Sequence, residues 1–205
     1  NLDSPIYGAF STGFQNSALV VAGYPKPCTA EENVEFSIYD PNNGGIFTHF
    51  TSSIPFERQY GAIFTLGNRI FGGFGENIRD CDGGCCKGYR CDLFEITPLN
   101  GQSVEISSCF PGVPRSAPAG FSVNGKGYVG LGRRGNEDTY SFNSDFWEFD
   151  PNQNKWRNIN PLPIQGETVP ENWGRQFPFV FQIDNRTFVG GGSHGAEYLN
   201  DIWEF

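Results

Sequence analysis

The sequence contains no methionine, two histidines and only 18% charged residues. Because methionine is absent and the first residue is Asn1, we expect a processed mature chain or a segment of a longer polypeptide. No apolar run approaches the roughly 18 residues that a transmembrane helix needs, so we expect no membrane span. Basic residues are also scarce, and the net charge of −9 argues against a nucleic-acid partner, which would need a basic surface.

Glycine and proline are abundant instead, with 27 and 14 copies among 205 residues. Long helices are therefore not expected, because both residue types disfavour the helix interior. Phenylalanine occurs 20 times and 38% of the residues are apolar, a composition typical of a β-rich chain that buries a core. The length fits one domain over residues 1–205.

Six cysteines suggest an oxidising compartment, and four of them lie in the segment CDGGCCKGYRC. They are Cys28, Cys81, Cys85, Cys86, Cys91 and Cys109. A zinc cluster would favour CxxC pairs or nearby histidines, and neither is present here. We therefore expect disulfides, with the pairing left open, in an extracellular or secreted protein. The sequon at Asn185 is a predicted glycosylation site.

A pattern of four short strands recurs four times. The first strands are expected at Tyr7–Phe14, Tyr60–Leu66, Ala119–Val123 and Phe177–Ile183. The second strands end in glycine, at Leu19–Gly23, Ile70–Gly73, Tyr128–Gly132 and Phe188–Gly192. The third strands are aromatic, at Glu35–Pro41, Asp92–Pro98, Asp145–Pro151 and Asp201–Phe205. Fourth strands follow only the first three, at Ile46–Thr51, Ser103–Ser108 and Lys155–Ile159. Aligning Val21, Phe71, Val129 and Val189 gives periods of 50, 58 and 60 residues.

Four strands at this period indicate a β-propeller blade. Glycines in the second strand let neighbouring backbones approach near the central channel. We predict an all-β propeller of four blades, each with four short antiparallel strands (named A to D), the last blade lacking strand D. The repeats span about 6–55, 58–112, 115–163, and 175–205 plus 1–5.

The repeats resemble the kelch-repeat family. The resemblance rests on the glycine pairs at 72–73 and 190–191, the segments Asp145–Pro151 and Asp201–Phe205, Trp156, and the arginines before strand A, Arg58, Arg115 and Arg175. It implies a β-propeller, commonly of six or seven blades, so four copies are a departure. Copper-radical oxidases of this family need several histidine and tyrosine ligands, which two histidines do not supply. We expect no metal and no cofactor.

The missing fourth strand has two interpretations. Asn1–Pro5 resembles the end of a strand D, so it would pair beside Asp201–Phe205 and close the ring. Alternatively, the rest of a longer polypeptide or a neighbouring subunit supplies the strand, which would permit a homo-oligomer or a filament by edge-strand pairing.

The B–C and D–A loops share one face of a propeller, and the long loops lie there. They are 24–33, 75–90, 133–143, 193–198 and 161–173, and we expect little secondary structure in them. Arg58, Arg115 and Arg175 are candidates for binding an anion near the channel, or else for bonding to loop carbonyls of neighbouring blades. Trp173 and Tyr198 are candidates for stacking on a sugar, and His194 is a candidate ligand or base.

No catalytic motif is evident. We therefore expect a non-catalytic, disulfide-stabilised extracellular module that binds a protein or a glycan on this face, or a structural subunit that assembles through its fourth blade. The alternative is a fragment or domain of a secreted propeller enzyme with its site at the channel mouth.

Overall fold

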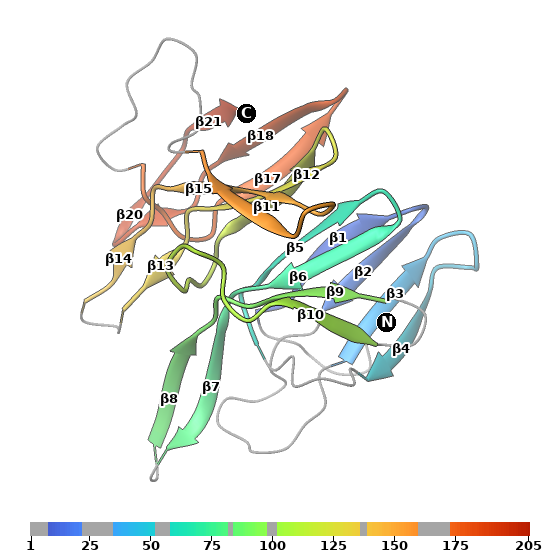
Figure 1. The fold of residues 1–205 in the computed structure, drawn as a ribbon, viewed down its shortest axis with the longest axis horizontal. Coiled ribbons are helices and arrows are strands. Elements are labelled where there is room, and N and C mark those ends of the chain that lie inside the picture. The colour runs from blue at the N-terminus through green and yellow to red at the C-terminus, as the bar shows by residue number, and fades with distance from the viewer. Residues whose placement is uncertain are drawn as a thin grey trace.

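The computed structural model describes residues 8–21, 35–51, 58–81, 84–97, 102–135, 139–159 and 173–205. These residues form antiparallel β-sheets, and among them no helix is long and apolar enough to cross a membrane. Four of the sheets are arranged as the blades of a β-propeller (Figure 1), which confirms the predicted fold class.

Each blade is a small sheet in which strand order follows chain order. Blade 1 contains β1 (Phe10–Phe14), β2 (Ser17–Val21), β3 (Glu35–Asp40) and β4 (Ile46–Thr51). Blade 2 contains β5 (Ala62–Leu66), β6 (Arg69–Gly73), β9 (Leu93–Ile96) and β10 (Ser103–Ser107). Blade 3 contains β11 (Ala119–Val123), β12 (Lys126–Gly130), β15 (Phe146–Asp150) and β16 (Lys155–Asn158). Blade 4 contains β17 (Phe179–Ile183), β18 (Arg186–Gly190) and β21 (Ile202–Glu204).

Blade 4 therefore has three strands in the described residues, as the repeat pattern predicts. The predicted pairing of Asn1–Pro5 beside its last strand lies outside the described residues.

The strand pairing corrects the alignment of the repeats. In each blade, the first residue of strand A pairs with the last residue of strand B. These pairs are Phe10 with Val21, Ala62 with Gly73, Ala119 with Gly130, and Phe179 with Gly190. Val21 thus corresponds to Gly73, whereas Phe71 corresponds to Leu19, so the alignment of Val21 with Phe71 was wrong. Side chains alternate along a strand, so register decides which face each residue occupies.

The B–C connections of blades 2, 3 and 4 are β-hairpins, so the expectation of little secondary structure there was wrong. They are β7 (Glu76–Cys81) with β8 (Gly84–Tyr89), β13 (Arg133–Arg134) with β14 (Ser141–Phe142), and β19 (Ser193–His194) with β20 (Glu197–Tyr198). The β7–β8 hairpin projects well beyond the blades (Figure 1).

Two successive residues with positive φ precede each hairpin and turn the chain sharply out of strand B. They are Phe74 and Gly75, Leu131 and Gly132, and Gly191 and Gly192. The left-handed conformation is unusual for Phe and Leu, so the surroundings hold this turn against backbone strain in blades 2 and 3, whereas glycine adopts it freely in blade 4.

The hydrophobic core lies between the blades. Separate clusters join blade 1 to blade 2, blade 2 to blade 3, and blade 3 to blade 4. The sheets approach closely because of glycine, since a Cβ on Gly127 would lie 2.3 Å from the Phe64 ring of the preceding blade. The wedge between blades 2 and 3 also holds Phe71 and Phe149, whose rings meet edge to face at 5.3 Å.

The innermost strands of the four blades, β1, β5, β11 and β17, line one central cavity of about 450 Å³. A chain of backbone hydrogen bonds connects the segments that enter these strands. The amide of Tyr60 donates to Gly8, that of Ala117 to Tyr60, and that of Phe177 to Ala117. Successive blades are thus joined in the same way around the channel.

Candidate binding site at the channel mouth

A buried arginine ties strand A to strand C in each of blades 2, 3 and 4. In blade 3, Arg115 donates through Nη1 and Nη2 to both carboxylate oxygens of Asp145, at 2.8 and 2.9 Å. The same guanidinium donates to the carbonyls of Leu131 and Val113, both at 3.1 Å. Burial would raise the pKa of Asp145, but the hydrogen bonds and charge of Arg115 outweigh it and hold that pKa below its ordinary value.

The equivalent pairs are Arg58 with Asp92 and Arg175 with Asp201. All three arginines are at most 1% exposed. Each guanidinium also bonds a backbone carbonyl of its own blade, whereas the structural interpretation of the sequence placed these bonds on loop carbonyls of neighbouring blades. These arginines position the channel mouth instead of lining it.

The residue that follows each arginine pairs with the first residue of the hairpin in the same blade. These two-residue bridges join Gln59 to Glu76, Ser116 to Arg133, and Gln176 to Ser193, each through two backbone hydrogen bonds of 2.8 to 3.0 Å. Because the three blades repeat this bridge around the channel, six polar side chains gather at its B–C/D–A end.

A hydrogen-bonded network connects five of these side chains, all but that of Ser116, across blades 2, 3 and 4. Arg133 donates to Gln176 at 2.7 Å and lies 3.4 Å from the Glu76 carboxylate. Gln59 donates to Glu76 at 3.0 Å, and Gln176 donates to Ser193 at 3.1 Å. A buried ion pair with hydrogen bonds to both partners is a costly feature that fixes geometry, so this network holds the three blades in register.

Three buried polar atoms of the six side chains have no hydrogen-bond partner among the described residues. They are Oε1 of Gln59, Oγ of Ser116 and Nε of Arg133. Because these atoms are buried, an ordered water fits them as a hydrogen-bond partner better than an apolar group does.

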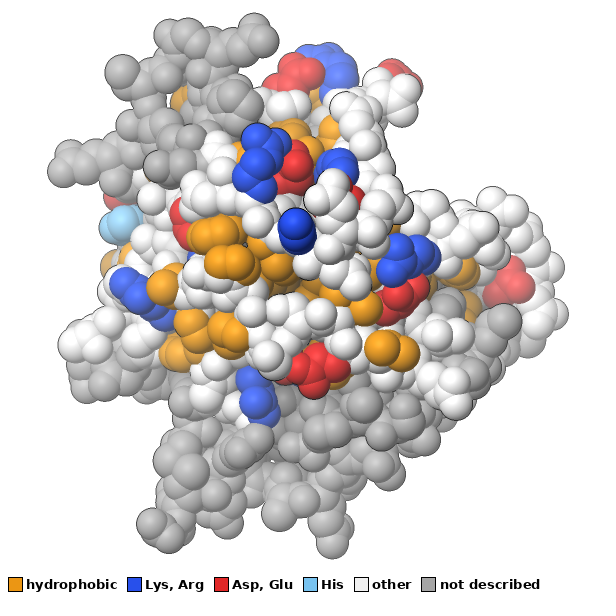
Figure 2. Space-filling model, in the orientation of Figure 1, with side chains coloured by type: hydrophobic (Ala, Val, Ile, Leu, Met, Phe, Trp, Pro, Cys, Tyr) orange, Lys and Arg blue, Asp and Glu red, His pale blue; other side chains and the backbone are white. Residues whose placement is uncertain are grey.

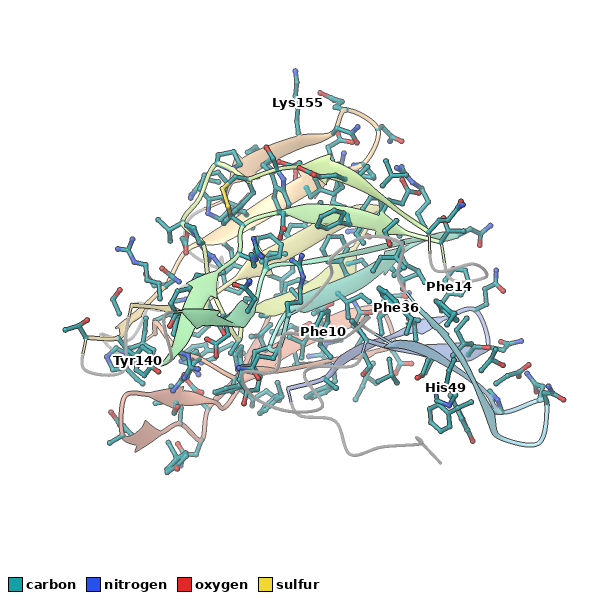
Figure 3. All side chains as sticks on the ribbon, turned by 90° about the horizontal axis from the view of Figure 1, so that it is seen from below. Phe10, Phe14, Phe36, His49, Tyr140 and Lys155 are labelled. Carbon is teal, nitrogen blue, oxygen red and sulfur yellow. A yellow bond between two sulfur atoms is a disulfide. The ribbon has the colours of Figure 1, made fainter. Side chains whose placement is uncertain are left out.

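Aromatic rings surround the arginine at the centre of the network. The Arg133 guanidinium carbon lies 4.6 Å from the ring centre of Tyr140, 5.5 Å from that of Phe177 and 6.0 Å from that of Tyr60. Phe177 is 45% exposed, so this aromatic rim is accessible. Figure 3 shows Tyr140 at the opposite end of the blades from Phe14, which ends the inner strand of blade 1.

The remaining predicted site residues differ in how deeply they are buried. Tyr198 in β20 is 89% exposed and pairs across the hairpin with Ser193, so it extends the rim. His194 is half-buried, donates from Nδ1 to the carbonyl of Gly174 at 2.5 Å, and contacts the ring of Phe142. Trp173 is 1% exposed and packs edge to face on Trp203, which places it in the core.

Within the described residues, the disulfide Cys91–Cys109 joins the end of the B–C connection of blade 2 to the segment after β10. Cys28 lies outside the described residues, as do the side chains of Cys81, Cys85 and Cys86. Asn185 is exposed in the turn between β17 and β18, at the far end of blade 4 from the rim. Among the described residues, no cluster of three or more His, Cys, Asp or Glu side chains could hold a metal ion.

Charges of both signs are interspersed on the face drawn in Figure 2, where no large patch of one sign stands out among the described residues. The channel mouth also holds charges of both signs, because the Glu76 carboxylate lies beside the Arg133 guanidinium. The network residues were missed in the sequence, although two repeated positions mark them: the residue after each blade arginine and the first residue after each glycine-containing turn.

No protein-family model matches this chain, and no curated protein matches it. Among solved structures, that of YjhT, a propeller, superposes with a TM-score of 0.68 at 16% sequence identity. The match covers 93% of this chain and 59% of YjhT, so the chain spans about three fifths of the length of that structure. This likeness shows the β-propeller fold.

Proposed function

We propose that this chain is an extracellular, kelch-like, non-catalytic binding module that takes a glycan at the channel mouth. The observation that carries the proposal is the convergence of a polar network from three blades beneath an exposed aromatic rim. Aromatic faces pack on sugar rings, and hydroxyl groups satisfy donors and acceptors alike.

Two features support the kelch-like and extracellular parts of the proposal. The arginine–aspartate pair and the bridge beside it recur in three successive blades, as expected of one repeated unit. The Cys91–Cys109 disulfide favours an oxidising compartment, where such bonds persist. A glycan on the exposed Asn185 would agree with the same location.

Binding is tested on a glycan array, followed by calorimetric titration of the tightest glycan. Tyr140→Ala and Tyr198→Ala should each weaken that glycan about five- to tenfold, the loss expected for one aromatic contact of about 1 kcal/mol. Lys155→Ala, an exposed substitution on β16 in the outer strand of blade 3, is the control and should leave the affinity unchanged.

Equal affinity in wild type and both tyrosine variants would place the ligand elsewhere and refute the proposed site. Capture of a protein partner that depends on the same two tyrosines would keep the site but replace the glycan with a protein. Conversion of the bound glycan by the wild-type chain would favour the alternative, a secreted enzyme with its site at the mouth.

Self-assembly through the fourth blade is a second proposed role. Its support is the apolar surface of that blade, where Phe179, Ile183 and Ile202 are each 44 to 55% exposed. Surfaces of this kind on a folded chain commonly mark a contact with another protein surface.

A further inference from the structure

The outer face of blade 4 is an apolar sheet surface that nothing in the described residues covers. It consists of Phe179, Phe181, Ile183, Phe188 and Ile202, which we call the open face. The strand register places these residues on the side of the sheet that points away from blade 3, whereas Val180 and Val189 point toward blade 3. Phe181 is 38% exposed, and Ile183 is 55% exposed.

The same face is an inter-blade interface in the blades that precede it. Phe181 and Phe188 are cross-strand partners stacked at 5.1 Å. Their counterparts in blade 2, Phe64 and Phe71, are stacked at 5.8 Å and buried beneath blade 3. In blade 3 the stacked pair is Phe121 and Tyr128, which lies beneath blade 4. The open face therefore has the side chains of a blade interface, and no blade within the described residues covers it.

A charged pair at the edge of the interface repeats as well. In blade 2, Arg69 pairs with Glu95 and also donates to the carbonyl of Pro151, which belongs to the following blade. In blade 4, Arg186 pairs with Glu204 and lies over the ring of Phe188, as Arg69 lies over Phe71. Arg186 thus occupies the position from which its counterpart reaches the next blade.

The chain also carries a surface that matches a covering blade. In blade 3 the residues that lie over Phe64 and Ala62 are small, Gly120 and Gly127. Blade 1 has small residues at the corresponding positions on its outer face, Ser11 and Ala18, with Gly13 beside them. Ser11 and Gly13 are exposed, and a Cβ on Gly13 would meet no atom within 4 Å.

We propose that the open face of blade 4 docks the outer face of blade 1 of a second copy of this chain. In the proposed dimer the contact is head to tail and is made twice, so that the four blades of each copy together form one ring of eight about a twofold axis along the channel. In this contact Arg186 reaches the carbonyl of Pro41, the counterpart of Pro151 in blade 1. This proposal extends the self-assembly role and is independent of glycan binding at the mouth.

The mass of the particle in solution, measured by sedimentation equilibrium, tests this contact. Wild type should sediment at twice the 22.7-kDa mass of the chain. Phe181→Glu on blade 4 and Gly13→Arg on blade 1 should each weaken association about 30-fold or more, because each places a charge in an apolar contact. Val104→Glu is the control and should stay dimeric, since Val104 is 63% exposed on β10, away from both faces.

A mixture decides whether the contact is head to tail. Phe181→Glu and Gly13→Arg chains should be monomers alone and dimers together, because one intact contact and one Glu–Arg pair form between them. All variants should keep the wild-type melting temperature when monomeric, since both positions are accessible to solvent. A monomeric wild type would overturn the proposal. A dimer that survives Gly13→Arg would overturn it as well, because blade 4 of one copy would then contact blade 4 of the other. A polymer would overturn the closed ring.

Discussion

The buried Arg115–Asp145 pair offers the sharpest test of how the blades are held together. Asp145→Asn keeps the size of the side chain and removes its charge. Arg115 is then left with 0% exposure and without a carboxylate, and a single amide oxygen replaces the two oxygens to which Arg115 and Trp147 donate. The perturbation is therefore confined to one pair and its immediate neighbours.

Removing one partner of a buried ion pair destabilises a protein by roughly 3 to 5 kcal/mol, since the other charge stays buried. The Asp145 side chain is 27% exposed and the amide still accepts one hydrogen bond, so we take the lower end, about 3 kcal/mol. For a chain of this length such a loss lowers the melting temperature by roughly 6 to 12 °C.

Urea unfolding followed by tryptophan fluorescence measures this loss. Glu148→Gln is the matched control on the neighbouring residues, because the amide can still accept from Tyr128 and an ion pair to Arg157, which is 69% exposed, contributes less than about 1 kcal/mol. Equal losses in the two variants would mean that the buried pair does not hold the blade, and the structural role assigned to the repeated arginines would be wrong.

Three further predictions follow from the same contacts. Replacing Cys91 and Cys109 by Ser should lower stability by about 3 kcal/mol for a closed loop of this size, and peptide mapping without reduction should recover the 91–109 pair from wild type. Gly127→Ala should destabilise the chain by roughly 1 to 3 kcal/mol in calorimetry, because its Cβ would meet the Phe64 ring. Asp145 and Asp201 each bond a blade arginine, which holds the pKa of each carboxyl below its ordinary value despite burial. The free energy of unfolding should therefore be full above about pH 4 and fall as the pH drops further. Urea midpoints measured across pH should show a shallower fall in Asp145→Asn than in wild type.

The blade architecture was predictable because each level of the sequence pattern points to the same structure. Short apolar strands, glycine at the ends of strand B and aromatic residues in strand C recur at similar spacing, and the structure places strands at these segments in all four repeats. A prediction from such a repeat is robust, because a strand that is hard to recognise in one copy is indicated by the corresponding segments of the other copies.

The register and the channel mouth were harder to predict. Val21 and Phe71 are both apolar residues near the end of strand B, and only the cross-strand partners show that they occupy different repeat positions. Arg133 and Glu76 are far apart in sequence and belong to different blades, so no local pattern marks them as partners. The hairpin that begins at Ser193 has two-residue strands, which are too short for an alternating pattern to be visible.

The most direct test of the proposed binding site is the crystal structure of the chain with the glycan that binds tightest on the array. We predict the sugar at the B–C/D–A end of the channel, with a ring packed on Tyr140 or Tyr198 and hydroxyl groups directed toward Arg133. A sugar bound at the opposite end, among the A–B turns near Asn124, would contradict the account.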